Sequence, residues 1–169
     1  MKKSIKLLAV LSVLLYILSS CLSSETEDPR TAEMEQSEIN TALANLENEG
    51  FDIDTTASGM FYVVQVAGEG PTVQEGDTCY LRYAGYFLDG TLFDASEYYH
   101  EDGIWELVHG EVSLIPGFEE AIGILNKGAE IDFIIPSELA YGSIGVTGIP
   151  AYTPLLFATQ LVDLKPASE

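Results

Sequence analysis

Apolar residues recur along the chain in arrangements that predict an apolar N-terminal segment, one helix and then a mainly β-stranded region. Leu7–Leu18 is a mostly apolar stretch. From about Met34 to Glu49 apolar residues return at helical spacing, and Gly50 follows as a C-cap. This predicts a short amphipathic helix, which could pack on the domain, serve as a stalk or mediate dimerisation. Its apolar stripe consists of Ile39, Leu43 and Leu46.

Beyond Met60, β-branched and aromatic residues predict a series of strands. The segment Asp77–Phe87 alternates, so Cys79, Leu81 and Tyr83 should share one face of its strand while Arg82 lies on the other. The other predicted strands are Met60–Gly68, Ile104–Gly110, Ala129–Pro136 and Leu155–Leu164.

A single helix is predicted among these strands, in the segment "FEEAIGILNKG" that follows Pro116. Two glutamates lie near its positive N-terminal end, and Lys127 with Gly128 should close it. Strands of this kind around one helix predict an α+β fold in which an antiparallel sheet curls over the helix. The apolar stripe of the helix consists of Phe118, Ala121, Ile122 and Leu125.

The N-terminus has the order of a secretory signal. Three lysines precede the apolar stretch, which is too short for a membrane span and leads into "LSSC", Leu18–Cys21. These four residues resemble a bacterial lipobox, whose Cys becomes the lipid-modified first residue of the mature chain. We predict that residues 1–20 are a lipoprotein signal peptide and that Cys21 carries the lipid. The mature protein would be anchored in the bacterial cell envelope, and the residues after Cys21 are compatible with the outer membrane. A plain signal peptide or a buried N-terminal helix is the alternative.

The chain is strongly acidic, with 27 Asp and Glu against 7 Lys and Arg and a net charge of −20. Three of the basic residues lie within residues 1–20, so residues 21–169 carry a net charge of −23. Nucleic acid is excluded as a partner because its phosphates need Lys and Arg. Such a body should also be repelled by anionic lipids, so lipid acyl chains would have to provide membrane attachment.

The remaining composition predicts one domain and no cofactor. Residues 21–33 are polar and acidic and are expected to form a flexible tether, followed by the helix and a connector over residues 34–57. Cys79 has no partner once Cys21 is lipidated, and its strand position predicts a small core residue. His100 and His109 lack metal-like spacing, and no nucleotide-binding or zinc motif occurs.

The stretch "GYFLDGTLFDAS" contains a hairpin and an unexpected acid. Leu88–Thr91 has the Asp-Gly pair that tight turns prefer. The strand after the turn reaches Phe93 and continues with Asp94, a carboxylate that is costly to bury. We expect the strand to end at this pair, so that the two successive side chains need not point to opposite faces. Taken alone, Asp94 could equally be an exposed residue that begins a turn.

Together, the ordered motifs "YAGYFLDGTLFDAS", "LIPGFEEAI", "LAYGSIGVTGIP" and "PLLF" resemble the FKBP-type peptidyl-prolyl cis-trans isomerase family. The resemblance covers residues 58–166. It implies a five- to six-stranded antiparallel half-barrel wrapped around one short helix, with the helix of residues 34–49 as an N-terminal addition. It also implies rotamase activity in protein folding without a cofactor or metal. The implied ligands are proline-containing polypeptides and FK506-like macrolides.

The resemblance also assigns roles to single residues. Phe118 would form the aromatic floor of a proline pocket, the Ile115 N–H and the Tyr141 hydroxyl would hold substrate carbonyls, and Asp94 would meet the rotating carbonyl. Taken singly, the aromatic residues could simply be core. The implied catalytic residues are Tyr83, Phe93, Asp94 and Tyr141. The implied substrate-binding residues are Trp105, Leu114, Ile115, Phe118, Ile149 and Phe157.

One segment departs from the family pattern. Members often place an Arg shortly after the Phe-Asp pair, whereas Glu97–Gly103 has none and is acidic. Arg82 is near in sequence, but alternation should turn it away from Tyr83. This departure leaves open an alternative function, a non-catalytic module that binds peptides or proteins as a chaperone.

Overall fold

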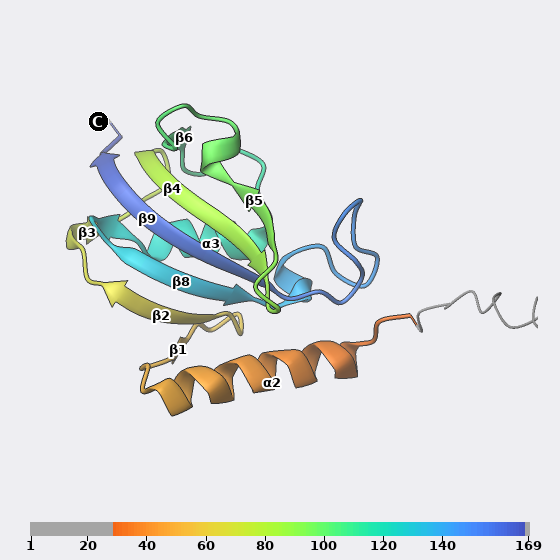
Figure 1. The fold of residues 1–169 in the computed structure, drawn as a ribbon. Helices are drawn as coiled ribbons and strands as arrows, with labels where there is room; N and C mark the ends of the chain where they lie inside the picture. Colours follow the sequence, from red (N-terminus) through yellow and green to blue (C-terminus); the bar gives the residue numbers. More distant parts are fainter. Residues whose placement is uncertain (1–28, 168–169) are drawn as a thin grey trace, which may run out of the picture.

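The computed structural model describes residues 29–167 (Figure 1). The predicted signal peptide and Cys21 lie outside this range. Among the described residues, no helix has both the length and the apolar character needed to cross a membrane.

One curved antiparallel sheet dominates the fold, as the sequence predicted (Figure 1). Its strand order is β1-β2-β8-β9-β4-β5, and β6 pairs with β4. Since β5 and β6 pair with successive parts of β4, they share one edge of it. A separate two-stranded sheet joins β3 and β7. The bounds are β1 Asp54–Thr55, β2 Phe61–Val66, β3 Glu69–Thr72, β4 Thr78–Phe87, β5 Leu92–Ala95, β6 Trp105–Val108, β7 Asn126–Lys127, β8 Glu130–Ile135 and β9 Leu155–Lys165.

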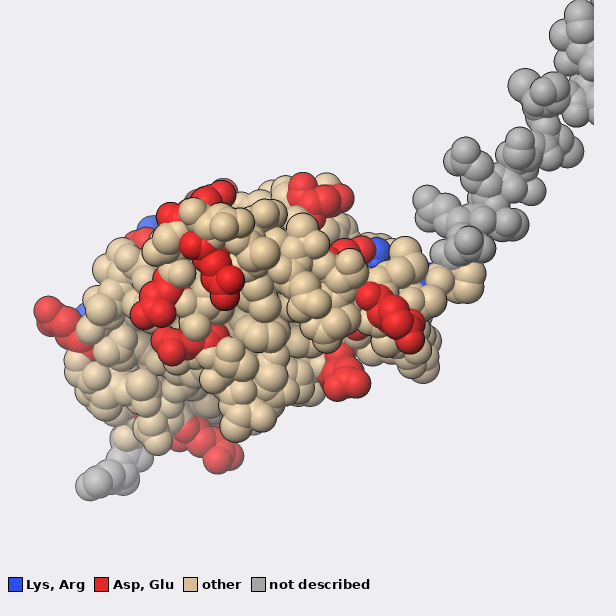
Figure 2. All heavy atoms as spheres, turned by 90° about the horizontal axis from the view of Figure 1, so that it is seen from below, with Lys and Arg blue, Asp and Glu red and all other residues tan. Residues whose placement is uncertain are grey.

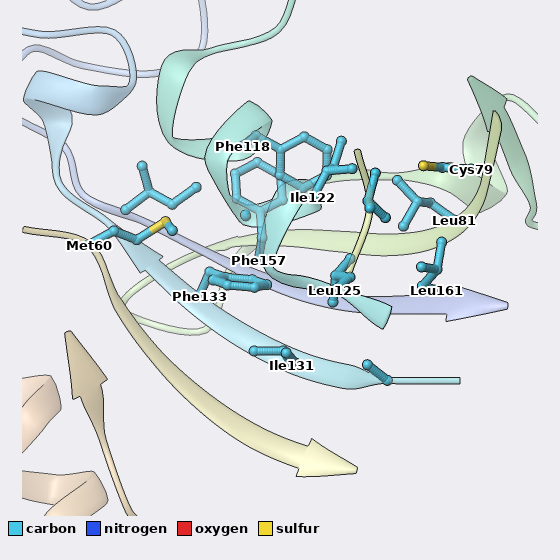
Figure 3. Packing of buried hydrophobic residues seen from close by; sticks show 14 of the residues in the cluster. Met60, Cys79, Leu81, Phe118, Ile122, Leu125, Ile131, Phe133, Phe157 and Leu161 are labelled. Atoms are coloured by element: carbon cyan, nitrogen blue, oxygen red, sulfur yellow. The ribbon is translucent and has the colours of Figure 1, made fainter. Parts of the chain in front are cut away.

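The helix α3 (Pro116–Ile124) lies against the concave face of the sheet, and the core fills the space between them (Figures 1 and 3). Its predicted stripe is buried throughout. The alternation in β4 is confirmed, because Cys79 and Leu81 are fully buried while Arg82 is exposed. The other large core side chains include Met60, Ile131, Phe133, Phe157 and Leu161.

The end of α3 was predicted wrongly. The helix stops at Ile124 with Leu125 as C-cap, and Asn126–Lys127 form β7 instead of a last helical turn. The backbone N–H of Val73 donates to the carbonyl of Leu125, and β7 pairs with β3. Pairing with a distant strand therefore satisfies backbone groups that a longer helix would have satisfied internally.

The strand after the hairpin does not end at the Phe-Asp pair, as was expected, but continues to Ala95. Tyr86 pairs with Leu92 and Gly85 pairs with Asp94, so the register shifts across this step. Phe93 is the extra residue of a β-bulge, and a bulge allows two successive side chains to lie on the same side of a strand. The bulge, rather than a strand end, lets Phe93 and Asp94 face one site.

The N-terminal helix α2 (Ala32–Glu49) runs across the outer side of the sheet (Figure 1). It begins at Ala32 rather than at Met34, because the Thr31 side chain caps it by accepting a hydrogen bond from the Met34 N–H. Ile39 is buried against the domain, whereas Leu43 and Leu46 are only partly buried. Figure 2 shows the face that carries α2, where acidic side chains are scattered widely and basic ones are few. Of the three options for this helix, the structure supports packing on the domain.

Candidate active site

A cavity of about 390 Å³ opens between the sheet, α3 and the loops at one end of the half-barrel. It brings together nine of the ten predicted site residues. Ser113, which the sequence did not single out, completes the lining. The predicted residues that line the cavity are Tyr83, Phe93, Asp94, Trp105, Leu114, Ile115, Phe118, Tyr141 and Phe157.

Aromatic rings form the floor and walls of the cavity. Phe118, the first core residue of α3, packs against Phe157 of β9 with ring centroids 4.7 Å apart (Figure 3). The Tyr83 ring lies 5.6 Å from Phe118 at 66° and 5.8 Å from Trp105. Such tilted pairs add to the stability gained by burying the rings, so the aromatic rings that a ligand would meet are held in place.

Asp94 is anchored by two hydrogen bonds at the wall of the cavity. The Tyr83 hydroxyl donates to Asp94 Oδ2 at 3.0 Å, and the Ala95 N–H donates to Oδ1 at 2.9 Å. Burial raises the pKa of the Tyr83 phenol far above its usual value of 10, and the negative charge of Asp94 adds to the shift. Tyr83 therefore stays protonated at neutral pH and remains a donor to the carboxylate.

The acidic segment Glu97–Gly103 places a second tyrosine near this carboxylate. The negative charge of nearby Asp94 raises the pKa of the exposed Tyr99. Ser96 joins the end of this segment to β4. Its Oγ accepts from the Tyr83 N–H at 3.2 Å and donates to the Gly103 carbonyl at 2.6 Å. Sequence reasoning noted the missing Arg but overlooked Tyr99, although this residue stands within the same segment.

The mouth of the cavity is formed by the loop before α3, which carries Leu114 and Ile115. Glu119 fastens the start of this loop, because its Oε1 accepts from the Gly110 N–H at 2.9 Å and lies 3.1 Å from His109 Nε2. Within residues 29–167, the Ile115 N–H donates no hydrogen bond to the protein. It is therefore a backbone donor available to a ligand.

Ile149 is the predicted site residue that does not line the cavity. A short bridge between Val146 and Ile149 turns the loop back on itself, and the Ile149 side chain packs into the core with 7% of its surface exposed. Its assignment as a cover of the entrance stays a prediction.

Neither a reactive thiol nor a metal cluster accompanies the cavity in residues 29–167. Burial, together with the charges of Asp77 and Glu119, raises the pKa of the Cys79 thiol to about 11, so it is not a nucleophile at neutral pH. No group of three or more His, Cys, Asp or Glu side chains is arranged to hold a metal ion in this part of the chain.

Known proteins resemble the chain in both sequence and structure. The family model described as FKBP-type peptidyl-prolyl cis-trans isomerase matches residues 70–162. The isomerase FkpA of Escherichia coli K12 is 38% identical over 115 residues, which are 68% of this chain and 41% of the relative. FkpA of Aeromonas hydrophila is 35% identical over 127 residues, 75% of this chain and 45% of the relative.

A crystal structure of Escherichia coli FkpA superposes with a TM-score of 0.69 at 28% identity, covering 99% of this chain and 75% of that chain. A peptidyl-prolyl cis-trans isomerase from Pseudomonas syringae gives a TM-score of 0.66 at 25% identity, with 82% and 99% covered. The chain spans less than half the length of these two curated FkpA relatives. With its half-barrel, its aromatic cavity and the match over residues 70–162, the chain belongs to the FKBP-type peptidyl-prolyl cis-trans isomerase family.

Proposed function

We propose that the protein is a peptidyl-prolyl cis-trans isomerase that accepts proline-containing polypeptides in the cavity above Phe118. One observation carries the proposal: a cavity of about 390 Å³ that is walled by aromatic rings holds a single anchored carboxylate, Asp94, at its wall. A proline ring needs an apolar pocket of this kind, and the peptide groups beside it need donors at the rim.

The reaction requires only rotation about the amide that precedes proline. Its barrier is about 18–20 kcal/mol because rotation breaks the resonance of the C–N bond. The charge separation of the amide falls as it twists, so a dry cavity favours the twisted amide over the planar one. No bond is made or broken during rotation, which agrees with the inert Cys79 thiol.

Some of the lining residues would bind the substrate, and Asp94 would act on the amide that rotates. The Ile115 N–H and the Tyr141 hydroxyl would each hold a substrate carbonyl beside the proline, so that binding energy favours the twisted amide. Phe118 would support the proline ring from below. Asp94, oriented by the Tyr83 hydroxyl, would meet the changed dipole of the rotating carbonyl without transferring a proton.

The test is the cis/trans exchange rate of a Leu-Pro model peptide, measured by NMR with the purified full chain. Acceleration by the parent is expected to fall about tenfold in Tyr141→Phe and in Asp94→Ala, the effect of losing roughly one hydrogen bond each. An FK506-like macrolide is expected to occupy the same cavity and abolish the acceleration. If the parent does not accelerate exchange, the isomerase proposal fails.

Peptide binding without acceleration would instead assign the protein to the second candidate function, a non-catalytic peptide-binding module. One observation favours that candidate. Within residues 29–167 Asp94 forms no ion pair, and its hydrogen-bond donors are the Tyr83 hydroxyl and the Ala95 N–H. An anchored but uncompensated carboxylate could therefore contribute to binding alone.

The protein would work in the bacterial cell envelope, held by acyl chains on Cys21 after removal of residues 1–20. The basic, apolar and small residues of the N-terminus support this location. In bacteria that make the full chain, the parent is expected in the membrane fraction and Cys21→Ser in the soluble fraction. The control Cys79→Ala changes only a buried core thiol and should keep the parent's location. A parent whose intact mass shows residues 1–20 still attached, or no acyl chain on Cys21, would rule out the lipid anchor.

A further inference from the structure

The N-terminal helix α2 is fastened to the loop that carries Tyr141, here called the Tyr141 loop and comprising residues 137–152. Glu35 of α2 is a carboxylate with only 7% of its surface exposed. It accepts from the Ser137 N–H at 2.5 Å and from the Ser137 Oγ at 2.6 Å. Hydrogen bonds to an ionised acceptor are the stronger kind, and both of these are buried.

A second contact fastens the other end of the same loop. Arg30 donates to the carbonyls of Ala151 at 3.2 Å and of Tyr152 at 2.9 Å. The guanidinium also forms a two-pronged pair with Glu38 of α2, at 2.9 and 2.6 Å. Arg30 therefore connects the helix to the last residues of the Tyr141 loop.

The residues that these contacts hold, Ser137 and Tyr152, are hydrogen-bonded to the neighbours of Tyr141. The Ser137 carbonyl accepts from the N–H groups of Ala140 and Gly142, which flank Tyr141 on either side. From the other end, the Tyr152 N–H donates to the Gly142 carbonyl at 2.9 Å. Tyr152 also has a φ of 51°, a region that disfavours residues with a side chain, so its conformation depends on the contacts around it.

We infer that Glu35 and Arg30 are positioning residues that set the place of the Tyr141 hydroxyl in the cavity, which makes α2 part of the isomerase unit. The inference rests on the proposed function and deepens it. The apolar contacts of α2 are modest, with Ile39 as its one buried aliphatic residue. Its polar contacts reach this loop directly from Glu35 and, through Arg30, from Glu38. Displacing a catalytic group by about 1 Å can cost up to roughly 100-fold in rate, so a small shift of the loop matters.

The decisive experiment combines Glu35→Ala with Tyr141→Phe in a double-mutant cycle on kcat/KM for the Leu-Pro peptide. Glu35→Ala alone is expected to lower kcat/KM about tenfold, mainly through kcat, because the hydroxyl is misplaced. In the Tyr141→Phe background the same change should cost less than about threefold, since the group it positions is already absent. Equal losses in both backgrounds, or no loss in the parent, would overturn the inference.

Two further variants separate positioning from general destabilisation. Glu35→Gln keeps the shape and an acceptor for the Ser137 N–H, so it should restore most of the activity. Glu47→Ala removes an exposed glutamate from the same helix and should leave kcat/KM unchanged. A Glu35→Gln variant as impaired as Glu35→Ala would contradict the role assigned to these hydrogen bonds.

Amide hydrogen exchange tests the positioning even if the parent proves not to be an isomerase. The N–H groups of Gly142, Gly145 and Tyr152 are hydrogen-bonded within the Tyr141 loop. Their exchange should become faster in Glu35→Ala and stay at the parent's rate in Glu47→Ala. Unchanged exchange in Glu35→Ala would show that α2 does not hold the loop.

Discussion

Replacing Phe118 by alanine is expected to lower the free energy of unfolding by about 3–5 kcal/mol and to remove nearly all acceleration of peptide exchange. Phe118 is 4% exposed, and its ring packs against Phe157 and Tyr83. The loss of stability follows from the apolar surface no longer buried and the void left in the core. The loss of activity follows because the proline ring would no longer have a floor. Urea denaturation measures the first effect and NMR exchange the second.

Phe133→Ala is the matched control, because it makes the same chemical change in the same core. Phe133 is fully buried and lies outside the cavity lining. It should lose a similar free energy of unfolding, yet retain the parent's activity per folded molecule at low temperature. Phe118→Leu should recover most of the stability but little of the activity. If the two alanine variants lose activity only in proportion to their unfolded fractions, Phe118 is a packing residue and not the floor of the site.

Local periodicity predicted the parts of the fold that depend on neighbouring residues. The alternation of Cys79, Leu81 and Tyr83 and the stripe that begins at Phe118 both predicted the buried face correctly. The errors arose where distant strands decide the outcome. Pairing of β7 with β3 ends α3 early, and pairing of β5 with β4 creates the bulge at Phe93. Neither pairing leaves a periodic signal in the segment that it changes.

In the candidate site, too, the features that depend on distant parts of the chain were the ones that the sequence did not predict by local pattern. Ordered motifs identified nine cavity residues, because the family resemblance already contained information about distant parts of the fold. Ser113 lines the cavity only through the path of its loop, and its residue type gives no signal. The Glu35–Ser137 contact joins positions 102 residues apart, and single-sequence patterns do not report such pairs. A polar residue at a buried helix position was the one available hint of Glu35's role.

A second large effect is expected from Gly117→Ala at the start of α3. A Cβ atom on Gly117 would lie 2.3 Å from Ile135 Cγ2 and 3.1 Å from Leu139 Cβ. Carbon atoms pack at about 3.5–4.0 Å, so α3 would have to move away from β8 by roughly 1 Å. We expect a net loss of about 2 kcal/mol in the free energy of unfolding, as is usual for overpacking. Acceleration should fall as well, because Phe118 directly follows the displaced residue and Ile115 lies two positions before it.

Gly123→Ala in the same helix should have the opposite effect on stability. A Cβ atom there meets only His109 Cε1, at 3.8 Å, which is ordinary contact. Alanine in a helix is favoured over glycine by roughly 0.5–1 kcal/mol, so this variant should be more stable than the parent and equally active. Thermal unfolding of Gly117→Ala and Gly123→Ala shows directly whether each substitution raises or lowers the stability. Because the substitution and the helix are the same, opposite signs would show that the close approach of α3 to Ile135 is what requires glycine at position 117. Stabilisation by both would mean that α3 lies farther from the sheet, and the cavity floor would then need to be placed again.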